Sequence, residues 1–223
     1  MKNNEIRAVY SKETIRIYQA YSYDIASEAV KLGTFGSKFK MDRMTWIKPS
    51  FLWMMYRCGW GTKENQECIL AIDLKREDFD YLVKNAVLST YQEDSYNSRE
   101  EWKYQIQNSE IRCQWDPERD IFGNPLNYRS IQIGIRGEAL KKYVNEWIVS
   151  LTDITEYVDA LREKKEIGQD ITELLPDEKT YEFLVNKGLV SMSIMNNFHD
   201  LCKKQNNKRK NLLFREYNRY FAG

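Results

Sequence analysis

Histidine is almost missing from this sequence: among 223 residues there is a single one, His199. A Ser-His-Asp triad, a Cys-His pair, an HExxH zinc site or a two-histidine iron site would each have to be built around that residue. The sequence therefore disfavours all four kinds of site. There is also no GxxxxGK(S/T) motif, and Gly59 and Gly61 are followed by Glu64 where a dinucleotide-binding fingerprint requires glycine. Neither a P-loop nor a Rossmann nucleotide site is expected.

Paired cysteines and long apolar runs are missing as well. Cys58, Cys68, Cys113 and Cys202 show no CxxC spacing, so we expect free thiols and no structural zinc or other metal. No window approaches the ~18 uninterrupted apolar residues of a membrane span. The opening residues MKNNEIRAVYSKET contain no apolar signal core. The sequence predicts a cytoplasmic protein without a membrane partner.

The amino-acid composition is typical of a folded protein. Hydrophobic residues make up 42% of the chain, aromatic residues 13% and charged residues 30%, which is too much apolar material for a disordered chain. Spacing and composition predict one α+β domain over residues 1–180. Residues 181–223 form a basic, helical C-terminal extension in this interpretation.

The formal net charge of +1 conceals an asymmetry between body and extension. Residues 203–219 hold seven Lys or Arg and one Glu, so they carry +6 and the rest of the chain −5. Such a segment can bind nucleic acid through its phosphates, or it can be the solvated face of an amphipathic helix docked on the body or on another subunit. The candidate nucleic-acid residues are Lys203, Lys204, Lys208, Arg209 and Lys210.

Hydrophobic periodicity predicts a mixed, mostly antiparallel central sheet with flanking helices. The helix after the first strand has Asp24 as its N-cap and Gly33 as its end, and Pro49 suits a first helical turn. Residues 148–154 are compatible with a strand or a helix end. Strands are expected at 15–21, 43–48, 68–74, 111–115 (ended by Asp116-Pro117) and 128–135; helices at 24–32, 50–57 (ended by Gly59), 76–88, around Trp102 (capped by Ser98), 137–147 and 156–166.

Residues 43–60, RMTWIKPSFLWMMYRCGW, alternate aromatic and cationic side chains. Trp46, Trp53 and Trp60 recur at intervals of seven. Aromatic faces beside cations suit a planar base and a phosphate, but large aromatic residues also build cores. The polar residues expected to be exposed here are Thr45, Lys48 and Ser50.

A second group of candidates follows the strand that starts at residue 111. The carboxylates of Asp116 and Glu118 are placed to orient a substrate hydroxyl or to stabilise a developing cation, or they belong to an ordinary solvated turn. In the strand over 128–135, Gln132 shares a polar face with Ser130. That face can line a cleft or meet water.

Five segments, IRIYQAY, RMTWIKPSFLWMMYR, LAIDL, QWDPERD and YRSIQIGIRGEALKKYVNEWIVSLTD, resemble a family of bacterial and fungal proteins known as a domain of unknown function. The resemblance spans roughly residues 5 to 180. It implies nothing for the extension that follows.

The order of elements also resembles the ADP-ribosyltransferase fold, which implies a split sheet and NAD as substrate. In that fold a first-strand His or Arg holds the nicotinamide half of NAD, and Gln19 stands at that place. An acidic residue that stabilises the charged ribose would fall on Asp116, Glu118 or the strand of Gln132, with no clean Glu counterpart. These departures imply altered chemistry or a binding-only descendant. The implied cofactor residues are Gln19, Tyr21, Arg43, Thr45, Trp46, Lys48, Ser50 and Tyr56.

Three functional interpretations follow. The first is an NAD-dependent transferase that modifies a nucleic acid or a protein and needs neither histidine nor metal. The second is a module that binds a nucleotide or single-stranded nucleic acid without turnover. The third is a structural or regulatory homo-oligomer.

Overall fold

The computed structural model describes residues 3–184. Its strands are β1 (Asn3–Asn4), β2 (Arg7–Ala8), β3 (Thr14–Tyr21), β4 (Thr45–Ile47), β5 (Cys68–Lys75), β6 (Val87–Leu88), β7 (Ile111–Arg119), β8 (Pro125–Ile135), β9 (Ile148–Asp153) and β10 (Lys179–Thr180). Its α-helices are α1 (Tyr23–Leu32), α2 (Phe51–Cys58), α3 (Arg76–Asn85), α4 (Arg99–Asn108), α5 (Gly137–Lys142) and α6 (Thr155–Glu166), with a π-helix at Tyr143–Trp147 and a 3-10 turn at Thr172–Leu174.

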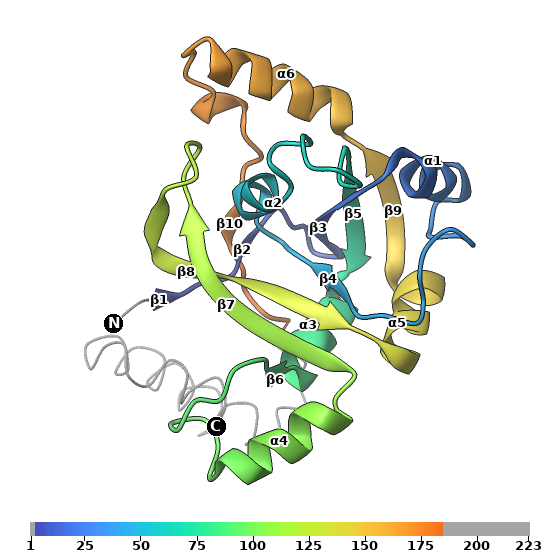
Figure 1. Cartoon of the computed structure of the whole chain (residues 1–223), viewed down its shortest axis with the longest axis vertical. Coiled ribbons are helices and arrows are strands. Elements are labelled where there is room, and N and C mark those ends of the chain that lie inside the picture. Colours follow the sequence, from blue (N-terminus) through green and yellow to red (C-terminus); the bar gives the residue numbers. More distant parts are fainter. Residues whose placement is uncertain (1–2, 185–223) are drawn as a thin grey trace, which may run out of the picture.

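Two separate sheets carry the fold (Figure 1). One is antiparallel with the order β3-β5-β9. The other has the order β1-β8-β7-β6, with β4 paired to β8 on the side away from β7, and only the two-residue strands β1 and β6 pair in parallel. The α+β class expected from the sequence, with mostly antiparallel strands, is confirmed.

The first sheet is covered on both faces. Its central strand β5, CILAIDLK, is apolar almost throughout, as expected for a strand between two neighbours. Leu70 and Ile72 pack into the larger core, whereas Ile69 and Ala71 face a second core with residues of α2 and α6. The sequence of β5 therefore places this sheet between two apolar layers.

The second sheet corrects one prediction. Asp116-Pro117 does not end the strand, because β7 continues to Arg119 and pairs with β8 along that length. Proline is tolerated since β6 pairs only with Arg112 and Cys113, so Pro117 lies on an open edge where its missing N–H costs no ladder hydrogen bond. Asp116 is consequently held within a strand and not in a turn.

Several helix boundaries also differ from the prediction. The N-cap of α1 is Ser22, with Asp24 in the first turn, whereas Gly33 ends the helix at φ 73° as expected. Helix α3 ends at Asn85, before the expected residue 88, because residues 87–88 pair with β7 as β6. Residues 148–153, compatible with strand or helix, are the strand β9. Long-range pairing decided these points.

The two sheets meet at the segment between β4 and α2. Lys48, one residue after β4, makes a single antiparallel bridge with Tyr18 of β3, whose N–H donates to the Lys48 carbonyl at 2.7 Å. Ser50 caps α2 by accepting from the N–H of Trp53 at 3.1 Å, so Pro49 precedes the cap and does not occupy the first turn. Gly59 ends the helix at φ 62°, as predicted. This segment orients α2 across the junction of the sheets.

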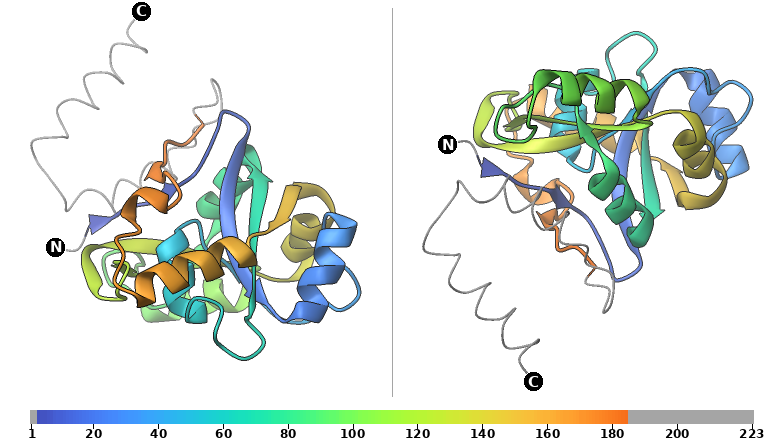
Figure 2. Two further views of the ribbon diagram at one scale, coloured as in Figure 1. Left: turned by 90° about the horizontal axis from the view of Figure 1, so that it is seen from above. Right: turned by 90° about the horizontal axis from the view of Figure 1, so that it is seen from below.

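The chain then returns to its start. Strand β10 pairs with β2, so the last described residues run beside the N-terminal ones (Figures 1 and 2). No helix within residues 3–184 is long and apolar enough to cross a membrane. Nor do those residues contain a cluster of three or more His, Cys, Asp or Glu that could hold a metal. The candidate nucleic-acid residues, 203–210, lie outside the described residues, and the nucleic-acid and homo-oligomer interpretations stay predictions.

Candidate functional site

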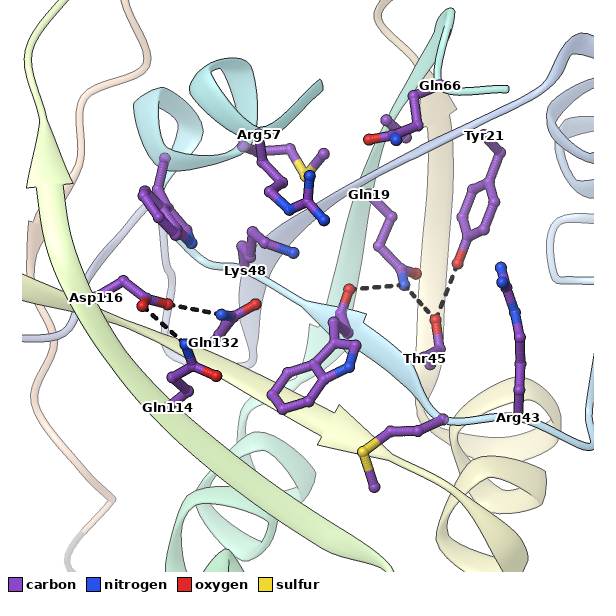
Figure 3. A pocket seen from close by; sticks show the side chains of 15 residues that line it. Gln19, Tyr21, Arg43, Thr45, Lys48, Arg57, Gln66, Gln114, Asp116 and Gln132 are labelled. Atoms are coloured by element: carbon purple, nitrogen blue, oxygen red, sulfur yellow. Dashed lines mark hydrogen bonds between the residues drawn. The ribbon is translucent and has the colours of Figure 1, made fainter. Parts of the chain in front are cut away.

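A pocket of 620 Å³ opens where the two sheets diverge below α2 (Figure 3). This volume lies within the range of small-molecule sites. Five elements drawn from residues 14–135 contribute to its walls: β3, β4, α2, β7 and β8. The lining residues are Gln19, Ala20, Tyr21, Arg43, Met44, Thr45, Trp46, Lys48, Trp53, Met54, Arg57, Gln66, Gln114, Asp116 and Gln132.

One wall of the pocket is a closed hydrogen-bond network around Gln19. Its Nε2 donates to Thr45 Oγ1 at 2.9 Å and to the carbonyl of Trp46 at 3.1 Å. Its Oε1 accepts from the hydroxyl of Tyr143 at 2.6 Å, and the hydroxyls of Tyr21 and Thr45 lie 3.1 Å apart. Gln19 is 3% exposed, and both ends of its amide are occupied. The predicted residues Gln19, Tyr21 and Thr45 thus come together as a rigid wall.

The opposite wall holds a carboxylate between two amides. Gln114 Nε2 donates to Asp116 Oδ1 at 2.9 Å, and Gln132 Nε2 donates to Asp116 Oδ2 at 2.6 Å. Gln114 and Gln132 face each other across the β7–β8 ladder. The structure therefore brings together two of the predicted catalytic residues, Asp116 and Gln132. Gln114 was missed, although its position two residues before Asp116 on the same strand face was a usable signal.

Three cations share the pocket with this carboxylate, and Figure 3 places one of them, Arg43, beside Tyr21 at the wall away from Asp116. Arg43 and Arg57 are exposed at the rim, and Lys48 is 5% exposed inside. None of the three forms a salt bridge within residues 3–184. Burial, reinforced by the charge of Arg57, lowers the pKa of Lys48 to about 8, while Asp116 opposes that shift. With one carboxylate against three cations, the pocket has a net positive character that suits an anion.

The expected exposure of the polar residues beside Pro49 was wrong. Thr45 is 8%, Lys48 5% and Ser50 1% exposed. The Thr45 hydroxyl is hydrogen-bonded in the Gln19 network, and the Ser50 hydroxyl caps α2. Pairing of β4 with β8, together with the bridge to β3, buries this short segment from two sides.

The three tryptophans divide between site and core. Trp46 and Trp53 line the pocket, whereas Trp60 packs on the second core with its ring centre 6.1 Å from that of Phe51. Tyr56 is 41% exposed and does not line the pocket. It stacks instead on Trp53 at 5.4 Å, under the guanidinium of Arg119.

Glu118 lies outside the pocket, although it follows Asp116 by two residues. It is 3% exposed, bonded to the hydroxyls of Ser50 and Ser130, and accepts from the N–H of Arg119 at 2.8 Å. Close by, Glu178 accepts from the N–H of Phe51 at 2.6 Å. We refer to Glu118 and Glu178 as the carboxyl pair.

Both members of the carboxyl pair are harder to ionise than ordinary glutamates. Burial raises the pKa of Glu118. Burial, together with the charge of Glu118, raises the pKa of Glu178 to about 8. Nothing in the sequence indicated Glu178, because it reaches α2 from a segment that only the tertiary fold brings there.

The fold and site together define an α+β protein with a cationic, tryptophan-lined pocket around one amide-held carboxylate. Residues 5–181 match the family described as a domain of unknown function (DUF4291), so the chain belongs to that family. This confirms the family resemblance seen in the sequence. No curated protein matches the chain.

Proposed function

We propose that this protein is an NAD-dependent transferase that moves an ADP-ribosyl group onto a nucleic acid or a protein. One observation carries the proposal: Asp116, held by two amides, shares the pocket with three cations that form no salt bridge within residues 3–184. A carboxylate fixed in advance stabilises positive charge that develops nearby, and free cations bind phosphate. NAD combines both features, because its ribose becomes positively charged as nicotinamide leaves and its centre is a pyrophosphate.

The residues of the pocket fit different parts of NAD. Arg43, Lys48 and Arg57 suit the phosphates, since charge-assisted hydrogen bonds are strong in a partly enclosed site. The indoles of Trp46 and Trp53 provide apolar surface for a planar base.

The transfer breaks the bond between C1′ of the ribose and the nicotinamide nitrogen, and nicotinamide departs with the electron pair. A new bond then joins C1′ to an oxygen or nitrogen of the acceptor, whose proton passes to water. Asp116 stabilises the charge at the ribose during this exchange. Gln114 and Gln132 keep its oxygens in place, so little reorganisation is needed.

A second candidate, nucleotide binding without turnover, is favoured by the state of Gln19. Both ends of its amide are hydrogen-bonded to protein groups. Gln19 is therefore poorly placed to form hydrogen bonds with the nicotinamide carboxamide. The same cations and indoles would still hold a nucleotide. Glu118, the other candidate acid, lies away from the pocket.

The test measures melting temperature and nicotinamide release with excess NAD. Ligand at a hundred times its dissociation constant stabilises by about 2.7 kcal/mol, which gives a readily measured shift. We expect Asp116→Asn to lower the release rate about 10²- to 10³-fold. Glu118→Gln is the matched control, because it removes a neighbouring carboxyl that does not line the pocket, and release should persist.

The other outcomes separate the two candidates. A melting shift without nicotinamide release supports the binding protein and contradicts the transferase. If NAD produces neither a shift nor release, the pocket does not bind NAD and both forms of the proposal are wrong.

A further inference from the structure

Lys48 differs from the other two cations of the pocket in its degree of burial. Arg43 and Arg57 are exposed, whereas Lys48 is 5% exposed. Figure 3 shows its side chain directed into the pocket between α2 and the β7–β8 wall. Within residues 3–184 its Nζ makes no hydrogen bond and no ion pair, and this atom opens to the pocket although most of the side chain is buried.

Among residues 3–184, none of the charged groups around Lys48 forms an ion pair with it. Arg57 on α2 repels its positive charge, and Asp116 on β7 attracts it without reaching ion-pair distance. The Cys58 thiol, also on α2, adds a weaker influence of the same sign as Asp116. Each oxygen of Asp116 accepts one hydrogen bond from an amide.

A lysine that is desolvated beside another cation is a known route to an activated amine. The pKa of about 8 at Lys48 leaves roughly one-tenth of its amine neutral at pH 7, about 300-fold more than for an ordinary lysine. The neutral amine is the nucleophilic form. Its backbone is fixed by the bridge to Tyr18 of β3.

We propose that Lys48 is a covalent, carbonyl-reactive residue of the pocket and that its ligand is a phosphorylated aldehyde, such as the open-chain form of a sugar phosphate. The Lys48 nitrogen bonds to the carbonyl carbon, the carbon–oxygen bond is lost, and the oxygen leaves as water with both amine hydrogens. The product is an imine, and no oxidant or reductant takes part. Arg57 and Arg43 bind the phosphate. This inference goes beyond the transferase proposal and does not depend on NAD being a substrate.

The probe for the test is pyridoxal 5′-phosphate, which carries an aldehyde and a phosphate. The full chain is incubated with it at pH 7, reduced with sodium borohydride and mapped by peptide mass spectrometry over time. We expect Lys48 to be labelled at least about ten times faster than Lys31, an exposed lysine on α1. Pyridoxal, which lacks the phosphate, should label Lys48 about ten times more slowly than the phosphate form.

The matched variants are Lys48→Arg and Lys31→Arg. The first keeps the positive charge and removes the amine, so the fast phase should disappear, whereas the second should leave it unchanged. Circular dichroism checks folding, and the wild-type ratio of Lys48 to Lys31 labelling decides the question if Lys48→Arg does not fold. Equal or slower labelling of Lys48 would overturn the inference.

Addition of NAD distinguishes this inference from the proposed function. Protection of Lys48 by NAD indicates that both ligands use one pocket. Fast labelling that NAD does not reduce leaves the reactive lysine standing and removes support from the transferase. If NAD binds but Lys48 is not labelled fast, the reactive lysine is contradicted and the transferase proposal still stands.

Discussion

The pocket and the N-terminal end of α2 surround ionisable groups in opposite ways. In the pocket, Lys48 is 5% exposed and has no hydrogen-bond or ion-pair partner among residues 3–184. At the start of α2, Glu118 is 3% exposed, and both it and Glu178 receive hydrogen bonds from protein donors. Similar burial therefore accompanies different roles. A group whose partners are all internal contributes to the fold, whereas a buried group left without one is available to a ligand.

The largest stability effect we expect comes from Glu178→Gln. The pKa of Glu178 is raised in the folded state to about 8, so folding favours its neutral form. The stability from this group is complete below its unfolded pKa of 4.5 and is lost as the pH rises to about 8. The variant should be more stable than the wild type at pH 9, by on the order of 3 kcal/mol, and nearly equal to it at pH 4.

Urea unfolding at several pH values measures this difference. The matched control is Glu173→Gln, an exposed glutamate in the same C-terminal stretch, which should leave the pH dependence unchanged. If the stability of Glu178→Gln declines with rising pH as steeply as that of the wild type, Glu178 is not the group that causes the decline.

Ser50→Ala should cost about 2 kcal/mol of stability. Ser50 caps α2 through the N–H of Trp53 and also bonds to Glu118, so the change removes a cap and leaves a buried carboxyl with one partner fewer. Ser130→Ala removes only the contact with Glu118 and should cost about half as much. Equal losses in denaturant unfolding would contradict a double role for Ser50.

Arg57→Gln should weaken NAD binding about tenfold and change stability by less than about 0.5 kcal/mol. Its guanidinium is exposed, makes no salt bridge within residues 3–184 and lines the pocket. Calorimetric titration with NAD gives the affinity and thermal melting gives the stability. A variant that loses stability but keeps its affinity for NAD would show that Arg57 stabilises the fold and does not bind the ligand. That result would contradict the distinction between the pocket and the start of α2.

Salt should produce the smallest effect. Raising the ionic strength from roughly 0.05 M to 0.5 M should weaken NAD binding several-fold, because Arg43 and Arg57 lie at the exposed rim of the pocket. The same change should alter the pH dependence contributed by Glu178 less, since its hydrogen bond to Phe51 is partly buried and salt screens buried charges less. Affinity measured in a salt series, beside urea unfolding in the same buffers, tests both expectations.

The secondary structure of this protein was largely readable because its signals are local. Alternation over residues 15–21, the apolar run of β5 and the glycines that end α1 and α2 are signals carried by neighbouring residues. The predictions that were wrong concern segments whose structure depends on residues distant in the sequence. Pro117 breaks a strand by every local rule, yet the open edge of β7 accommodates it.

The site residues, too, were indicated partly by local sequence and partly by the tertiary structure. Residue type marked Trp46 and Lys48 in one segment, and Asp116 and Gln132 in two others, as separate candidates, and the pocket contains all four. Type could not separate Asp116 from Glu118, because two residues of one strand were equally suited to the chemistry. The position of α2 separated them, since Ser50 at its start covers Glu118 and leaves Asp116 open to the pocket.

By itself, then, the sequence determined the α+β class, most of its elements and the side chains that can supply chemistry, because propensity, periodicity and residue type are short-range properties. Only the tertiary structure decided which of those side chains are paired. The amide of Gln19 is hydrogen-bonded to Tyr143, Glu178 is hydrogen-bonded to α2, and Lys48 is largely buried with no partner in the described part of the chain. Pairing depends on which distant segments meet, and packing of the two sheets around α2 settles that.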